Sequence, residues 1–190
     1  MPGYEEVVER LRRSVVWVQN GVQVLNGRGG GSGVVWDVVP EARGLVVTNA
    51  HVVRSNHVSV VDAWGRRRTA RVIKHDPERD LALLEVPAGG LEPAEIGDST
   101  LLRSGQIVLA IGNPLGIAGA VAAGVIHGAG SKWIQADVHL APGNSGGALA
   151  DAAGRVIGIN TMVFRGIGLA VPSNEVKAFV RGEFRSARAA

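Results

Sequence analysis

Cysteine is absent from the 190 residues of this sequence. This absence excludes a disulfide framework, a cysteine nucleophile and a thiolate metal site, and it leaves the cellular compartment open. Aromatic residues are scarce, at 4%, so a core must consist mainly of Val, Ile, Leu and Ala. No apolar run approaches the ~20 residues of a membrane-spanning helix. The sequence therefore predicts no disulfide and no membrane span.

The N-terminal stretch lacks the charge order of a secretory signal peptide. "MPGYEEVVERLRRSVVWV" is acidic, then basic, then briefly apolar, whereas a signal peptide starts basic and continues into an apolar stretch. As written, the sequence indicates a cytoplasmic protein. An extracytoplasmic location is the alternative, if a targeting segment was trimmed.

Charge of either sign is modest, because 20 Lys and Arg face 17 Asp and Glu. The densest basic cluster is Arg66–Arg68, which we interpret as a solvated hairpin. Nucleic-acid binding favours a larger basic face interleaved with aromatics, and the four tryptophans are scattered, so we expect no nucleic-acid partner. No His, Asp and Glu cluster has metal-ligand spacing, so we expect no metal or other cofactor.

Glycine and short β-branched runs are abundant. The sequence has 27 glycines, and about a dozen β-branched runs recur at roughly 10–15-residue spacing, a pattern typical of an all-β sandwich or barrel. A stretch rich in Pro, Gly and acidic residues, 87–100, leaves about half of the runs on each side. We therefore expect two small β-barrels, residues 1–95 and 96–190, that together form one domain.

Helical patterns occur only at the two ends of the chain. Residues 4–13 have apolar positions on one side, acidic residues early and arginines late, which suits the helix dipole. Residues 173–184 also have helical spacing, and Ser173 after Pro172 is the predicted N-cap.

Three residues in three different contexts are candidates for catalysis. Ser145 lies in "PGNSGG", where glycines permit a sharp turn and successive N–H groups can bind an oxyanion. His51 lies in the run "VVTNAHVV", and Asp80 opens "DLALLEV". Taken singly, each has a plain structural interpretation: a glycine-rich turn, a structural or solvated histidine, and a strand-start cap. Asp76, before Pro77, is the weaker acid candidate because it suits a turn.

The order of these residues is more informative than any one of them. His, Asp and then Ser is the order of the double-barrel serine proteases. His51 and Asp80 fall in the first half and Ser145 in the second, which predicts a site in the cleft between two barrels.

Six segments carry a family resemblance. They are "GSGVVWD" (31–37), "VVTNAHVV" (46–53), "DPERDLALLEV" (76–86), "AIGNPLG" (110–116), "GNSGGAL" (143–149) and "VIGINTMVFRGIGLAVPSN" (156–174). In this order the chain resembles the protease domain of the HtrA/Deg family of trypsin-like serine endopeptidases.

The resemblance implies a fold and a catalytic site. The fold is all-β, with two six-stranded antiparallel β-barrels of the chymotrypsin type and short N- and C-terminal helices. His51 would be the general base, Asp80 its orienting acid and Ser145 the nucleophile. The backbone N–H groups of Gly143 and Ser145 would form the oxyanion hole, with Asn144 between them.

The resemblance also implies a polypeptide substrate, unfolded or extended, that adds as a strand along Asn160, Thr161 and Met162. The pocket for the residue before the cleaved bond (P1) would be lined by Leu140, Val163 and Phe164. These side chains carry no acid, which favours a small or medium aliphatic P1 residue; core packing is the alternative role for all three. The resemblance favours a homotrimer.

The sequence departs from the family in ways that leave a second function open. It has no counterpart of the PDZ domain, and the segments "HGAGSKWIQADV" and "MVFRGIGLAVP" are shorter than in the family. His139 replaces a small residue, and we interpret it as a solvated loop histidine. A protease-like module that binds peptide without cleaving it, or a latent one, is therefore the alternative to an active endopeptidase.

Overall fold

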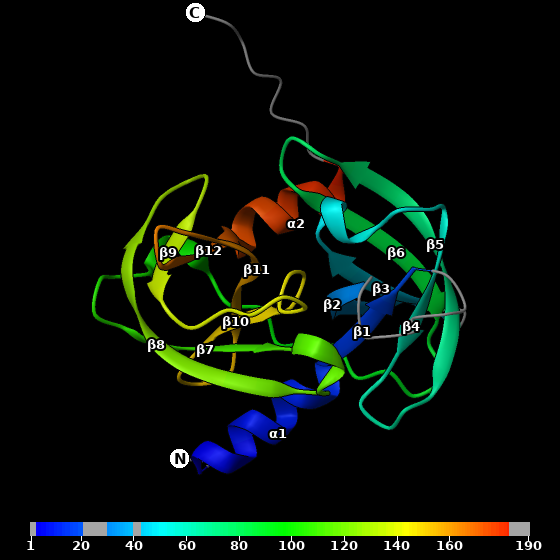
Figure 1. Cartoon of the computed structure of the whole chain (residues 1–190), viewed down its shortest axis with the longest axis horizontal. Coiled ribbons are helices and arrows are strands. Elements are labelled where there is room, and N and C mark those ends of the chain that lie inside the picture. Colours follow the sequence, from blue (N-terminus) through cyan, green and yellow to red (C-terminus); the bar gives the residue numbers. More distant parts are fainter. Residues whose placement is uncertain (1–2, 21–29, 40–42, 183–190) are drawn as a thin grey trace, which may run out of the picture.

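The computed structural model describes residues 3–20, 30–39 and 43–182 of the chain. Within them, twelve strands close into two antiparallel β-barrels, and a helix lies near each end of the chain (Figure 1). The predicted fold class, two six-stranded barrels with terminal helices, is confirmed.

The first barrel has the strand order β1-β2-β3-β6-β5-β4. Its strands are β1 (Val15–Gln19), β2 (Gly30–Val39), β3 (Arg43–Thr48), β4 (His57–Val61), β5 (Arg67–Asp76) and β6 (Leu81–Pro87). The second barrel has the order β10-β11-β12-β9-β8-β7. Its strands are β7 (Ile107–Gly112), β8 (Ala120–Ala129), β9 (Ile134–Asp137), β10 (Ala148–Asp151), β11 (Val156–Phe164) and β12 (Ile167–Pro172). Short 3-10 turns are η1 (Ala50–Val52), η2 (Ser99–Leu101) and η3 (Pro114–Gly116).

The segment between the barrels passes from one to the other over a few residues. The Ala94 N–H donates to the Val35 carbonyl of β2 at 2.8 Å. The next residue belongs to the second barrel, because the Glu95 carbonyl accepts from the Val156 N–H of β11 at 2.7 Å. The predicted boundary after residue 95 falls in this segment and stays a prediction.

The helices are α1 (Tyr4–Ser14) and α2 (Ser173–Arg181). The predicted N-cap of α2 is wrong: Pro172 occupies that position. The Ser173 side chain is fully buried and donates to the Gly97 carbonyl at 3.0 Å, because the start of α2 packs against the inter-barrel segment. The last residues of the predicted range, 183–184, lie outside the described residues.

One hydrophobic cluster joins the barrels and both helices. It contains Leu11 of α1, Val47 of β3, Leu109 of β7, Ile159 of β11 and Phe179 of α2. Two further clusters fill the two barrel interiors. Burial of one such side chain stabilises a fold by about 1.5–3 kcal/mol. The shared cluster therefore holds the barrels in a fixed relation, which the site between them requires.

The cluster Arg66–Arg68 lies at the β4–β5 turn, as the hairpin prediction implies, but it is only partly solvated. The Asp62 side chain is 0% exposed and accepts from Arg66 Nε and Arg68 Nη1, both at 2.8 Å. Burial raises the pKa of Asp62, but these hydrogen bonds outweigh burial, and the pKa lies below its ordinary value. Because the Arg68 side chain is 10% exposed, the sequence-based interpretation is wrong for that arginine.

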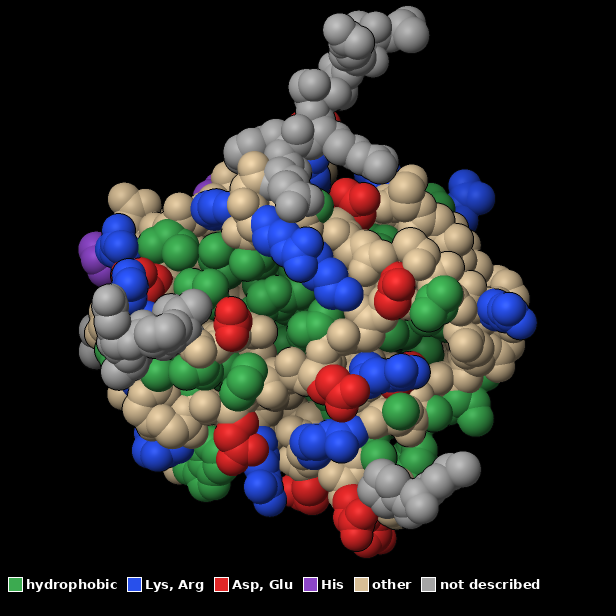
Figure 2. All heavy atoms as spheres, turned by 180° about the vertical axis from the view of Figure 1, so that it is seen from behind, with side chains coloured by type: hydrophobic (Ala, Val, Ile, Leu, Met, Phe, Trp, Pro, Cys, Tyr) green, Lys and Arg blue, Asp and Glu red, His purple; other side chains and the backbone are tan. Residues whose placement is uncertain are grey.

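Figure 2 shows the molecule from behind, with Lys and Arg side chains interspersed among Asp, Glu and apolar ones. Over the described part of this face, the charges form no broad field of one sign. In the described ranges, no helix has the length and apolar character needed to cross a membrane.

Candidate active site

His51 lies on the η1 turn that follows β3. The turn is held at the Ala50 carbonyl, which accepts from the Val53 N–H at 3.1 Å and from His75 Nε2 at 3.2 Å. His51 Nδ1 lies 2.9 and 2.8 Å from the two carboxylate oxygens of Asp80. A carboxylate only accepts, so this contact places the imidazole proton on Nδ1 and leaves Nε2 to act as a base.

Asp80 immediately precedes β6 and has a left-handed backbone, with φ of 54°. Few residues other than glycine adopt this conformation. The Asn49 side chain supports it, because its Nδ2 donates to the Asp80 carbonyl at 2.8 Å. The Asp80 side chain is 15% exposed. Burial raises its pKa, but hydrogen bonds from His51 and Thr161 outweigh burial, so the pKa lies below the ordinary value and the carboxylate is ionised at neutral pH.

Thr161 of β11 links this acid to the nucleophile, a role that the sequence did not reveal. Its Oγ1 donates to the Asp80 carboxylate, and its backbone carbonyl accepts from Ser145 Oγ at 2.8 Å. The sequence predicted Thr161 only as a substrate-binding residue. Asp80 and Thr161 are 81 positions apart and in different barrels, so no local pattern could have indicated the contact.

The Ser145 hydroxyl points toward Thr161 in this structure. Among the described residues it forms no hydrogen bond with His51. The three predicted catalytic residues are thus joined through Thr161. Transfer of the Ser145 proton to His51 requires the hydroxyl to rotate away from the Thr161 carbonyl.

The segment around Ser145, residues 141–147, is called the nucleophile turn, and it leaves two backbone N–H donors available. The turn Ala141–Asn144 is closed by the Asn144 N–H, which donates to the Ala141 carbonyl at 3.0 Å, and Gly143 adopts a φ of 102°. A positive φ at this third turn position is typical of a type II turn. In the part of the chain that is described, the N–H groups of Gly143 and Ser145 donate to no protein acceptor. They meet a requirement for an oxyanion hole, whereas the Asn144 N–H is used to close the turn.

The predicted substrate residues fall into two groups. Asn160 is 1% exposed, and its N–H and carbonyl bond to Gly147 and Gly146 of the nucleophile turn. Met162, Val163 and Phe164, at the end of β11, are exposed by 45%, 48% and 59%. The core-packing alternative is therefore wrong for Val163 and Phe164.

Leu140 is half-buried and packs against the second barrel's interior cluster. It also lies beside Gly168, where an added Cβ would be 3.2 Å from Leu140 Cδ1. Gly168 pairs with Val163 across β11 and β12, so Leu140 is both a core residue and a neighbour of the predicted pocket. His139, by contrast, is exposed, as its interpretation as a solvated histidine requires.

Comparison with known proteins finds a matching family model and similar sequences. The family model of the trypsin-like peptidase domain matches residues 31–159. The periplasmic serine endoprotease DegP of Salmonella typhimurium is 40% identical over 164 residues, which cover 77% of this chain. The serine protease Do-like HtrB of Bacillus subtilis is 34% identical over 210 residues, covering 92% of this chain.

The fold has a similar solved counterpart. The crystal structure of the serine endoprotease from Yersinia pestis matches with a TM-score of 0.84 and 32% identity, covering 99% of this chain and 69% of that one. The chain spans 34% of the length of the Salmonella protein and 46% of the length of the Bacillus protein. It therefore corresponds to the protease portion of these longer relatives.

Proposed function

The chain belongs to the HtrA/DegP family of trypsin-like serine proteases, and we propose that it is a serine endopeptidase that cleaves unfolded or extended polypeptide. One observation carries the proposal: hydrogen bonds run from His51 through Asp80 and Thr161 to Ser145, across the two barrels. An acid, a base and a nucleophile so connected are the parts that covalent peptide hydrolysis uses.

The proposed reaction proceeds through an acyl-enzyme. The Ser145 hydroxyl rotates toward His51 Nε2, gives up its proton and attacks the substrate carbonyl. The oxyanion is bound by the N–H groups of Gly143 and Ser145, and His51 returns the proton to the leaving amine. Water, activated by His51, then hydrolyses the ester. Asp80 stays ionised throughout and stabilises the imidazolium.

The β11 edge supports an extended substrate. The backbone N–H and carbonyl of Asn160 already form hydrogen bonds with the nucleophile turn. A substrate strand would therefore pair beyond Asn160, along Met162–Phe164. In the described sheet this stretch pairs with β12 alone. Strand addition requires an unpaired backbone, which folded proteins rarely expose, and it therefore selects unfolded polypeptide. The homotrimer stays a prediction.

The predicted pocket supports a small or medium aliphatic P1 residue. Its proposed walls, Leu140, Val163 and Phe164, carry no charge. The Arg165 guanidinium lies 5.3 Å from the centre of the Phe164 ring. A cation at this edge disfavours Lys and Arg, so we expect peptides with Val, Ala or Leu at P1 to be cleaved faster than those with Lys or Arg.

The test compares three proteins: wild type, Ser145→Ala, and Ser131→Ala as an exposed-serine control. We expect wild type and the control to degrade reduced, unfolded casein and to be labelled at Ser145 by a fluorophosphonate, with mass spectrometry locating the label. Loss of Ser145 should lower turnover by about 10⁴–10⁶-fold. Equal activity of wild type and Ser145→Ala would refute the proposal.

The alternative is a peptide-binding module that does not cleave. It is favoured by one observation: the Ser145 hydroxyl donates to the Thr161 carbonyl and not to His51. Such a module would retain unfolded casein on a column and yet resist fluorophosphonate labelling. The same labelling experiment therefore separates the two functions.

A further inference from the structure

We propose that Ser32 is a positioning residue for the oxyanion hole. This residue of β2 binds the carbonyls of both Gly143 and Ser145, whose N–H groups bind the oxyanion in the proposed mechanism. The inference rests on the proposed endopeptidase function and adds to it a residue from the opposite barrel.

Both contacts are short. The Ser32 N–H donates to the Ser145 carbonyl at 2.7 Å, and Ser32 Oγ donates to the Gly143 carbonyl at 2.7 Å. Ser32 is 0% exposed. Peptide units are planar, so each bond fixes the plane of the unit whose carbonyl it holds. The Ser145 N–H belongs to the unit between these two, and its direction is therefore constrained from both sides.

A second residue fixes the direction of the Ser32 hydroxyl. The Asn113 N–H donates to Ser32 Oγ at 2.8 Å, which leaves the hydroxyl proton for the Gly143 carbonyl. Asn113 is itself anchored, because its Nδ2 donates to the Val16 carbonyl at 2.9 Å and its Oδ1 accepts from the Gly119 N–H at 3.1 Å. Ser32 therefore has one defined hydrogen-bonding arrangement.

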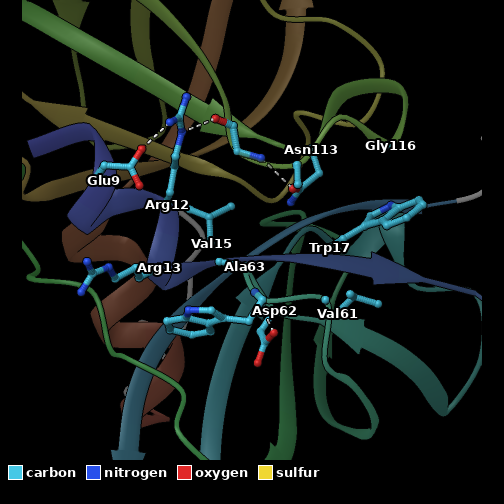
Figure 3. A pocket seen from close by; sticks show the side chains of 14 residues that line it. Glu9, Arg12, Arg13, Val15, Trp17, Val61, Asp62, Ala63, Asn113 and Gly116 are labelled. Carbon is cyan, nitrogen blue, oxygen red and sulfur yellow. Dashed lines mark hydrogen bonds and ion pairs between the residues drawn. The ribbon is translucent and has the colours of Figure 1, made fainter. Parts of the chain in front are cut away.

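Figure 3 shows the surroundings of this anchor. Asn113 lies at the wall of a cavity of about 680 Å³ that also borders α1 and the β4–β5 turn. Arg12 of α1 donates to the Gly119 carbonyl at 2.9 Å. The support of Ser32 thus extends through Asn113 and Gly119 to the N-terminal helix.

Two glycines pack closely against Ser32. A Cβ added to Gly112 would lie 2.9 Å from Ser32 Oγ, and one added to Gly146 would lie 2.0 Å from the Ser32 carbonyl oxygen. Removing the hydroxyl therefore leaves the Gly143 carbonyl and the Asn113 N–H without the partner that each has now. The nucleophile turn then loses one of its two bonds to Ser32, while Ser145, His51 and Asp80 remain intact.

The test measures kcat and KM of the full chain on an internally quenched peptide. The variants are Ser32→Ala, Ser32→Cys and, as a matched control, Ser173→Ala. Ser173 is also 0% exposed and also donates to one carbonyl, that of Gly97 on the inter-barrel segment. Urea unfolding of every variant measures how much stability is lost when a buried hydroxyl is removed, so that this loss can be separated from an effect on kcat.

We expect Ser32→Ala to lower kcat by about 10- to 100-fold, less than the loss of an oxyanion donor itself, with KM changed by less than about twofold. Ser32→Cys should fall between wild type and Ser32→Ala, since a thiol is a weak donor. It also keeps the test decisive if the alanine variant does not fold. Ser173→Ala should keep the wild-type kcat.

Two results overturn the inference. The first is a Ser32→Ala variant, or a folded Ser32→Cys variant in its place, whose kcat equals that of Ser173→Ala. The second is an effect on KM alone. A wild-type protein that neither cleaves the peptide nor reacts with a fluorophosphonate refutes the proposed function, and the inference falls with it. Active wild type with an unaffected kcat at Ser32 refutes the inference alone.

Discussion

Thr161→Val should lower kcat/KM by about 10- to 30-fold. Valine matches the shape of threonine and removes only the hydroxyl that donates to Asp80. A hydrogen bond to a charged group contributes about 1.5–3 kcal/mol. Asp80 retains its contact with His51 and is 15% exposed, so we use the lower part of that range, about 1.5–2 kcal/mol, at about 1.4 kcal/mol per tenfold. The Thr161 carbonyl, which accepts from Ser145, is unchanged by the substitution.

The assay is kcat/KM at pH 7.5 on the quenched peptide, with Ser14→Ala as the matched control. Ser14 and Thr161 are both 2% exposed, and the Ser14 hydroxyl donates to the Leu11 carbonyl at 2.9 Å, within α1. The control should lose some stability and no activity. A Thr161→Val loss below about threefold, or one equal to the control's, would show that the Thr161 bond does not support catalysis.

The same substitution has a signature in the pH dependence of stability. The pKa of Asp80 is lower in the folded protein than in the unfolded chain. The contribution of the Asp80 carboxylate to the free energy of unfolding is therefore complete above the unfolded pKa of about 3.9, and it is lost as pH falls through the folded pKa. Thr161→Val moves the folded pKa back toward the ordinary value. The stability difference between wild type and variant should therefore be full above about pH 4.5 and shrink below pH 4. A difference independent of pH would contradict this assignment.

Three further outcomes follow from the buried Asp62 and the nucleophile turn. In urea unfolding, Asp62→Asn should lower the free energy of unfolding by about 3 kcal/mol, because it breaks a buried ion pair. Glu85→Gln, whose two arginine partners are exposed, should lower it much less. Equal losses of stability in the two variants would contradict this reasoning. The pKa of Asp62 is lowered in the folded protein, so the Asp62 carboxylate should stabilise the fold above about pH 4 and lose this effect as pH falls further. The stability of Asp62→Asn should lack this dependence on pH. Gly146→Ala should abolish casein cleavage, because its Cβ would lie 2.0 Å from the Ser32 carbonyl oxygen. Gly105→Ala, which also has a positive φ but lies in open space, should keep its activity. Similar activities of the two variants would argue against the steric explanation.

The architecture could be predicted from the sequence because it depends on local signals, whereas the roles of the candidate site residues stay predictions. β-branched runs and glycine turns marked the strands of both barrels, and charge placement marked α1. The Ser173 prediction failed because a serine before a helical pattern suits an N-cap, whereas here the hydroxyl satisfies a carbonyl 76 positions away.

The contacts between the barrels could not be predicted. The bonds from Thr161 to Asp80 and from Ser32 to Gly143 join residues 81 and 111 positions apart. Their existence depends on how two closed sheets pack, which no local spacing encodes. The same holds for Arg68, whose burial depends on the carboxylate of Asp62 and not on the basic run that contains it.

The docking of α1 constrains the order in which the chain can fold during synthesis. α1 is made before the second barrel, yet Arg10 donates to the Ala153 carbonyl, 143 positions later, and a Cβ on Gly154 would lie 2.9 Å from Val7. During synthesis, the apolar face of α1 therefore stays exposed until most of the second barrel has been made. A chain stalled before that point leaves this apolar face exposed, and the cleft between the barrels forms only after the second barrel has been made.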